Sequence, residues 1–220
     1  MRHLSRLYDL EDPLSCLRRD LPQKSQYKEL ILTKITAHYE NKLRISATGN
    51  SLMTYLNVST LGLRGRHHPA LSNMTTTNDV RIARPHLKFL AGNYLTYQIK
   101  AEQSGGSPLC RICTSGQEET ICHVISSCQQ LAVERETFFL EFRQFCSLTK
   151  NHIDFDDISK CEENVTQFIL DPSSLNLPVR VSLSDPLMSE FFKLCRQLCH
   201  IIDKTRIRLL KKMESDKESG

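Results

Sequence analysis

Apolar residues recur every three or four positions along most of the chain, a period that predicts helices packed by one face and therefore an all-α protein. The first stripe, from Tyr27 to Leu43, predicts a helix of roughly 20 residues that ends near Gly49. From residue 46 to residue 78 the period is lost, and glycine, serine, threonine and asparagine become frequent. We expect an irregular connection there, with a short extended segment around residues 52–56.

A second helical pattern begins near Asn78, which we expect to cap it. Pro85 and Gly92 interrupt this pattern, so it predicts either a kinked helix or a short turn before a helix that starts at Pro85. The glycine-containing run from Ser104 to Pro108 then ends it. The apolar side of the segment consists of Val80, Ala83, Leu87, Leu90, Tyr94 and Leu95.

The C-terminal half repeats the helical period. It predicts a long helix over residues 124–148, a shorter one over about 157–170 that an Asp-Pro pair ends, and a last one over about 185–213. Between the last two helices, the loop 172–185 could contain a brief extended piece, and the tail 214–220 should fray. The core stripe of the last helix is expected to be Phe191, Cys195, Leu198, Ile202 and Leu209.

Composition narrows the class of protein. The chain has 220 residues, is 40% hydrophobic and carries a net charge of +4, which is enough apolar content for a core and only a mild basic excess. No run approaches the ~20 apolar residues that cross a bilayer, so we expect no membrane partner. The nine cysteines are an odd number, which fits reduced thiols in an intracellular protein, nuclear or cytoplasmic.

One cluster of residue types and spacings indicates a specific chemistry. Cys110, Cys113, His123 and Cys128 form C-x2-C-x9-H-x4-C, and three thiolates with one imidazole are a ligand set that holds Zn²⁺ tetrahedrally. With four protein ligands no position is left for water, so we expect one structural zinc ion. The alternative is that these are ordinary buried cysteines.

The zinc motif also suggests how the chain is organised, as a helical bundle around a small zinc-binding turn. We expect an N-terminal helical region over residues 1–104, the zinc motif and its following helix over 105–148, and a C-terminal helical region over 149–213. Cys122 lies beside His123 but has no short return spacing, so we interpret it as packing. The same interpretation holds for the cluster Cys195-x3-Cys199-His200, since Cys195 belongs to the core stripe.

Basic residues form two rows on the predicted helices. Such rows can neutralise phosphates along a nucleic-acid backbone, although a solvated helix face gives the same pattern. Acidic residues nearly cancel the basic charge over the whole chain. The first row is Arg81, Arg84 and Lys88, with Arg64 and Arg66 in the preceding loop; the second is Arg196, His200, Lys204, Arg208 and Lys211.

Several short stretches follow one another in a recognisable order. They are Leu90-Ala91-Gly92-Asn93-Tyr94, Cys110-Arg111-Ile112-Cys113, Glu119-Thr120-Ile121-Cys122-His123, Cys128 and Phe168-Ile169-Leu170-Asp171-Pro172. This order resembles the zinc-binding region at the C-terminal end of non-LTR retrotransposon reverse transcriptases. The similarity extends over about residues 20 to 212, and its specific part is the zinc stretch. It implies binding to template RNA or target DNA during target-primed reverse transcription, with the reverse-transcriptase polypeptide as a further partner.

Catalytic motifs are missing from the sequence. A polymerase palm needs paired aspartates in a turn between strands, whereas the one adjacent pair, Asp156-Asp157, precedes a predicted helix and is better interpreted as a cap. No Gly-rich phosphate loop, serine-nucleophile elbow or nucleotide-binding fingerprint occurs either. We therefore expect a non-catalytic C-terminal fragment that binds nucleic acid and no small-molecule substrate. The alternative is a zinc-stabilised helical module for protein partners.

Overall fold

The computed structural model describes residue 8 and residues 23–50, 53–60, 68–71, 73–149, 158–175 and 186–218. Over these residues the secondary structure is helical, and the sole strand-like pairing among them is an isolated bridge between Leu109 and Glu118. The prediction of an all-α fold is confirmed. The chain forms two compact units, one made of Met1–Asn50 and Val58–His67, the other of Ser51–Asn57 and His68–Gly220.

The first unit contains α3 (Lys24–Thr48) and the short 3-10 turn η1 (Val58–Thr60). Gly49 caps α3 as expected, since its N–H donates to the carbonyl of Ile45 at 3.0 Å. The apolar stripe of this helix is only partly covered, and Tyr39 and Leu43 are each about half exposed.

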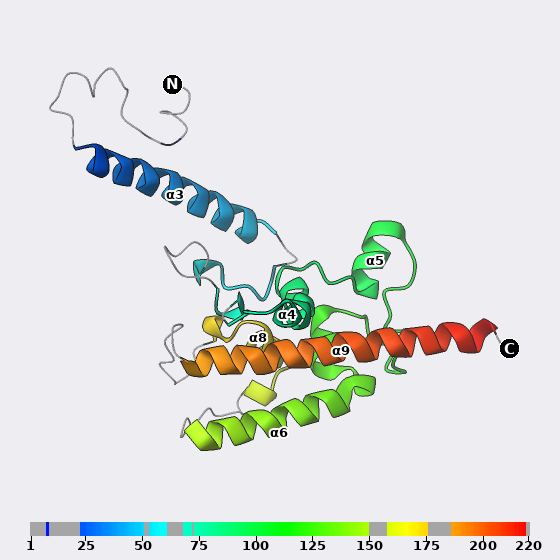
Figure 1. Ribbon diagram of the computed structural model, residues 1–220. Coiled ribbons are helices and arrows are strands. Elements are labelled where there is room, and N and C mark those ends of the chain that lie inside the picture. Colours follow the sequence, from blue (N-terminus) through cyan, green and yellow to red (C-terminus); the bar gives the residue numbers. More distant parts are fainter. Residues whose placement is uncertain are drawn as a thin grey trace. The chain divides into compact units, whose positions relative to one another are not determined.

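In the second unit, α9 (Pro186–Glu218) is the central element, and α4 (Thr77–Leu90), α6 (Ala132–Thr149) and α8 (Glu162–Leu170) pack against it (Figure 1). The short helix α5 (Tyr97–Ser104) follows α4. Both α4 and α5, which the sequence assigned to an N-terminal region, thus belong to the same unit as the C-terminal helices.

A capping box starts α4. The hydroxyl of Thr76 accepts the N–H of Asp79 at 3.2 Å, and the Asp79 carboxylate accepts the N–H of Thr76 at 2.8 Å. The cap is therefore Thr76 and not Asn78, because Thr76 is the residue whose extended backbone directs its hydroxyl at the third helical amide. Pro85 lies inside one helix, which ends before Gly92, a residue with φ of 66°.

Phenylalanine rings join three helices of the second unit. Phe142 of α6, Phe168 of α8 and Phe191 of α9 form a triangle with ring centroids 4.9 to 5.5 Å apart. All three rings are buried, and aromatic pairs at these separations add to the apolar area that they remove from water. The predicted core stripe of α9 is buried except at Leu209, which is partly covered.

Several predicted elements are wrong in detail. The helix predicted over residues 124–148 is broken at Cys128, whose ψ of 117° is extended; a π-helical turn, η3 (His123–Ser127), precedes it, and the 3-10 turn η4 (Gln129–Leu131) and α6 follow. Residues 214–218, which the sequence assigned to a frayed tail, continue α9 to Glu218, and residues 219–220 lie outside the described residues. Residues 53–56 form a turn and not an extended segment.

Other predictions fall partly or wholly outside the described residues. Asp156-Asp157 lies outside them, as does most of the loop 172–185. Within that loop, the described part begins with the 3-10 turn η5 (Pro172–Ser174). Ile158 and Ser159 are helical and Lys160 lies in a turn, so the helix predicted to start near residue 157 is interrupted before α8, which starts at Glu162.

Asp171 is a buried carboxylate that ties three segments together. Its oxygens accept the N–H of Asn57 at 2.8 Å, the Nε2–H of His68 at 3.1 Å and the N–H of Ser173 at 3.1 Å. The other ring nitrogen of His68 accepts the N–H of Ala70 at 3.1 Å, which fixes the tautomer that donates to Asp171. Both histidine nitrogens are thus used in holding the fold.

Removing the charge of Asp171 should destabilise the protein and change its response to acid. Burial alone would raise the pKa of this carboxyl, but hydrogen bonds from His68, Ser173 and Asn57 lower it below its ordinary value. A lowered folded-state pKa gives stability that is present above the unfolded-state pKa of about 4 and is lost as the pH falls through the folded-state value. We expect Asp171→Asn to cost about 1–3 kcal/mol at pH 7 and to flatten the acid dependence, measured by urea unfolding at pH 7 and pH 3.

The matched control for this measurement is Asp216→Asn, which changes an exposed carboxylate near the end of α9. It should leave both stability and acid dependence unchanged. Equal behaviour of Asp171→Asn and the wild-type protein would contradict the role assigned to the buried carboxylate.

Candidate metal centre

The four residues of the cysteine and histidine motif meet in space. One ligand atom from each of Cys110, Cys113, His123 and Cys128 lies within 4.8 Å of the other three, and all four residues are buried. Sγ of Cys113 is 3.3 Å from Nε2 of His123. A tetrahedral zinc site with Zn–S bonds of ~2.3 Å separates its sulfurs by about 3.8 Å. The four ligand atoms lie at comparable distances from one another, so the cluster suits a small metal ion.

A short hairpin presents the first two ligands. The N–H of Cys110 donates to the carbonyl of Gln117 at 2.9 Å, and the N–H of Glu119 donates to the carbonyl of Pro108 at 2.8 Å. Gly116 closes the turn with φ of 69°, a left-handed conformation that glycine adopts without strain. These bonds hold both thiols of C-x2-C on the same side of the hairpin.

The π-helical turn η3 explains how His123 and Cys128 face the same point. An α-helix rotates by about 100° per residue, so side chains five residues apart would point roughly 140° away from each other. In η3 the N–H of Cys128 instead bonds to the carbonyl of His123 at 2.7 Å, the five-residue closure of a π-turn. This closure brings the two ligands to one side of the turn.

Hydroxyl groups orient the ligands from outside the cluster. Oγ1 of Thr120 accepts the N–H of His123 at 2.9 Å and so starts the turn. Oγ of Ser127 lies 3.3 Å from Nδ1 of His123, which leaves Nε2 directed at Cys113. A second partner on the distal nitrogen is the usual support of a metal-binding imidazole.

The electrostatics of the sulfurs favours a bound cation. A hydrogen bond from the Cys128 thiol lowers the pKa of Cys110 to about 5, and the same bond raises the pKa of Cys128. Two thiolates this close repel each other. A divalent cation would offset the repulsion and allow both sulfurs to ionise.

A buried ion pair connects this centre to α9. Arg206 donates to Glu119 through Nε at 3.0 Å and Nη2 at 2.7 Å, and the N–H of Tyr97 donates to the same carboxylate at 2.7 Å. Glu119 has no exposed surface. Despite its burial, Arg206 has a raised pKa because of its hydrogen bonds to Glu119. Sequence reasoning missed this pair, although Arg206 continues the four-residue spacing of core residues after Ile202.

The predicted nucleic-acid residues are placed as follows. Arg196 is buried, and its Nη1 donates to the carbonyl of Ala70 at 3.0 Å, so it does not belong to an exposed row. Arg64 and Arg66 lie outside the described residues. Exposed side chains remain at Arg81, Arg84 and Lys88 on α4 and at Lys204, Arg208 and Lys211 on α9.

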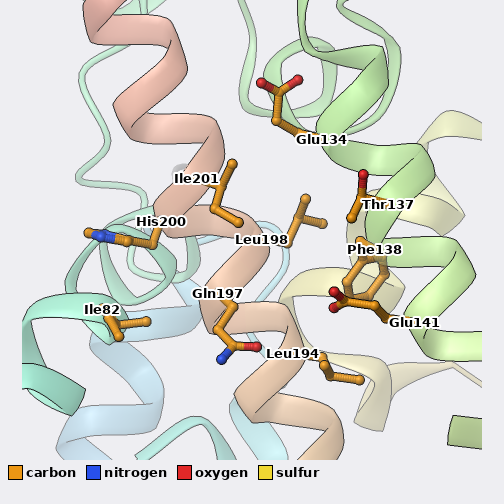
Figure 2. Close-up of a pocket in the computed structure, with 10 residues that line it drawn as sticks. All are labelled: Ile82, Glu134, Thr137, Phe138, Glu141, Leu194, Gln197, Leu198, His200 and Ile201. Carbon is orange, nitrogen blue, oxygen red and sulfur yellow. The ribbon is translucent and has the colours of Figure 1, made fainter.

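The two basic rows meet at His200. Burial and the positive charges of Lys204 and Arg81 lower the pKa of His200, so these two cations lie near it from different helices. Figure 2 shows His200 extending from α9 toward the helix that carries Ile82, at the edge of a groove of about 340 Å³ between α4, α6 and α9. None of the four candidate metal ligands lines this groove.

Cys122, Cys161, Cys195 and Cys199 do not join the metal cluster. Cys122 accepts a hydrogen bond from Thr166 at 3.5 Å, in agreement with the packing role predicted for it. Cys195 and Cys199 are fully buried in the core beside His200, and burial raises the pKa of both thiols. In the part of the chain that the structure describes, the cluster of four is the sole grouping of this kind.

Comparisons with protein-family models, with curated proteins and with solved structures found no match to this chain. No helix among the residues with described structure combines the length and apolar character needed to span a bilayer.

Loss of one ligand should remove the metal and loosen the region around it. We expect Cys113→Ser to bind less than one tenth of the metal that the wild-type protein binds. The free energy of metal binding at a structural site, on the order of 10 kcal/mol, depends on a complete set of ligands. Elemental analysis of purified protein measures the metal, and thermal unfolding measures the stability. Cys122→Ser is the matched control, since it changes a neighbouring thiol outside the cluster. Full metal content in Cys113→Ser would show that the ligand set is wrong.

The buried ion pair should behave as a unit. Glu119→Gln leaves the Arg206 charge buried without its partner, so we expect a loss of about 3–5 kcal/mol in the free energy of unfolding. The double variant Glu119→Gln with Arg206→Met removes both charges and should recover part of that loss. Urea unfolding of the two single variants and the double variant measures the coupling, and strictly additive losses would contradict it.

Proposed function

We propose that this protein is a non-catalytic, zinc-dependent module that binds RNA or DNA. The observation that carries the proposal is the convergence of Cys110, Cys113, His123 and Cys128, next to helices that expose rows of basic side chains. Zinc is the metal of choice for this ligand set because three thiolates and one imidazole in a small closed site suit its tetrahedral preference. The ion is structural: four buried protein ligands leave no coordination position for water or substrate.

The basic surface of α4 and α9 supports contact with a nucleic-acid backbone. Arg81, Arg84 and Lys88 follow one another at three- and four-residue spacing, so they share one side of α4. Lys204, Arg208 and Lys211 do the same on α9. Arg81 and Lys204, one from each row, both lie near His200 together with the carboxylate of Asp203, so the two rows approach each other there.

The resemblance to the C-terminal zinc-binding region of non-LTR retrotransposon reverse transcriptases supports the same function. Several residues of the shared pattern have a physical task in this fold: Glu119 binds Arg206, Thr120 caps the turn, and His123 and Cys128 complete the cluster. On this proposal the module binds template RNA or target DNA for a reverse-transcriptase polypeptide that supplies the chemistry.

The most enzyme-like pair in the described residues supports a non-catalytic assignment. His68 and Asp171 have the arrangement of a carboxylate that orients a general base. The second nitrogen of His68, which would take a proton from a nucleophile, is occupied by the N–H of Ala70. We therefore assign this pair to the stability of the fold.

A second function is favoured by the groove between α4, α6 and α9. Ile201 at its edge is 46% exposed, and Val133 and Leu140 on α6 are 72% and 58% exposed. Apolar side chains that share an exposed helical face are typical of protein interfaces. A zinc-stabilised module for protein partners is thus the alternative, and it predicts an increase in mass with concentration or with an added reverse-transcriptase fragment.

Charge reversal on α4 tests the nucleic-acid function. We expect the triple variant Arg81→Glu, Arg84→Glu and Lys88→Glu to weaken binding to single-stranded RNA and to duplex DNA, regardless of sequence. The slope of log K against log salt should decrease in magnitude by about 2–3, since each lost phosphate contact removes roughly 0.7–0.9. Gel-shift titrations at several salt concentrations measure both quantities.

The control for this experiment has the same change of net charge at another place. Lys24→Glu, Lys28→Glu and Lys42→Glu alter three exposed lysines of α3 and should reduce affinity less. Absence of salt-sensitive binding by the wild-type protein, with zinc present, would overturn the proposed function and favour the protein-partner alternative.

A further inference from the structure

The ring of Tyr97 holds two positively charged side chains beside the metal cluster. The guanidinium of Arg111 lies 4.4 Å from the ring centroid, and the ammonium of Lys100 lies 4.8 Å from it. Arg111 is one of the two residues between Cys110 and Cys113, whereas Lys100 is one turn along α5 from Tyr97. Cation–π attraction therefore brings together two charges from separate elements.

Tyr97, the residue that both cations contact, is held in place by burial and by a hydrogen bond. It is 9% exposed, and its backbone N–H donates to the buried carboxylate of Glu119 at 2.7 Å. A third cation, the guanidinium of Arg206, lies 5.8 Å from the centroid of the same ring. Its charge is paired with the carboxylate of Glu119. The ring is thus fixed by the ion pair that connects the metal hairpin to α9.

The charges of Arg111 and Lys100 are not neutralised by a carboxylate as the charge of Arg206 is. Within the described segments, no carboxylate lies at ion-pair distance from Arg111 or Lys100, in contrast to Arg206. Arg111 is exposed and Lys100 is half-buried, so both charges remain accessible from outside. Like charges held near one ring repel each other, and the phosphates of a bound nucleic acid would relieve that repulsion.

We propose that Arg111 and Lys100 bind the phosphate backbone of the nucleic acid, at a position set by the metal-binding hairpin. This inference rests on the proposed function and adds to it a contact outside the two basic rows. Arg111 suits the task because its planar guanidinium presents several donors to phosphate oxygens, and Lys100 adds a point charge. The contact depends on the metal, since binding by Cys110 and Cys113 fixes the backbone of Arg111.

The test is the double variant Lys100→Ala with Arg111→Ala. Its salt slope for single-stranded RNA should be smaller in magnitude than that of the wild-type protein by about 0.7–2, the range from one shared to two separate phosphate contacts. Affinity should decrease by a similar factor for all sequences, because a phosphate contact carries no sequence information. Metal content should match the wild-type protein, since neither residue is a ligand, and thermal unfolding should change only slightly, through the loss of the cation–π contacts with Tyr97.

Two further variants make the result specific. Lys24→Ala with Lys42→Ala removes the same charge from α3 and should leave the salt slope nearly unchanged. Lys100→Arg with Arg111→Lys keeps both charges at the proposed site and should retain most of the wild-type salt slope. If the wild-type protein binds RNA and Lys100→Ala with Arg111→Ala has an unchanged slope, the phosphate contact is wrong and the proposed function stands. If the wild-type protein does not bind at all, both are overturned.

Discussion

The ion pair between Glu119 and Arg206 is the interaction on which the second unit depends most. It buries one carboxylate and one guanidinium from segments 87 residues apart and satisfies the carboxylate further with the N–H of Tyr97. Burying either charge alone would cost several kcal/mol, so the pair forms only when the metal hairpin, the start of α5 and α9 are all in place. It therefore makes the assembly of these three elements cooperative, and it positions the ring that holds Arg111.

The metal cluster concerns a local part of the fold, the hairpin and the π-helical turn that carry its ligands. The hairpin needs Gly116 to turn back, and the spacing of His123 and Cys128 needs a π-helical closure that interrupts the predicted helix before α6 begins at Ala132. The ion pair and the core of phenylalanine rings hold the two ligand-bearing segments close together, and a bound metal would stabilise that arrangement in turn.

The proposed binding surface consists of the basic side chains that the fold leaves exposed. Arg196 and Arg206 are both on α9, but they are buried and donate to a backbone carbonyl and to a carboxylate. Lys204 and Arg208, on the same helix, are exposed. A row of basic residues in a sequence thus contains two kinds of side chain, those that hold the fold and those that remain available to an external anion.

The sequence by itself determined the helices and the ligand set, because both depend on spacing within short segments. The 3.6-residue period identified α3, α4 and α9, and C-x2-C-x9-H-x4-C identified four residues that the structure brings within 4.8 Å. Tertiary structure alone decided the partner of Glu119, the inward direction of Arg196 and the extended backbone at Cys128. Each of these is settled by the burial and pairing of groups that the fold brings together, and a periodic pattern carries no information about such contacts.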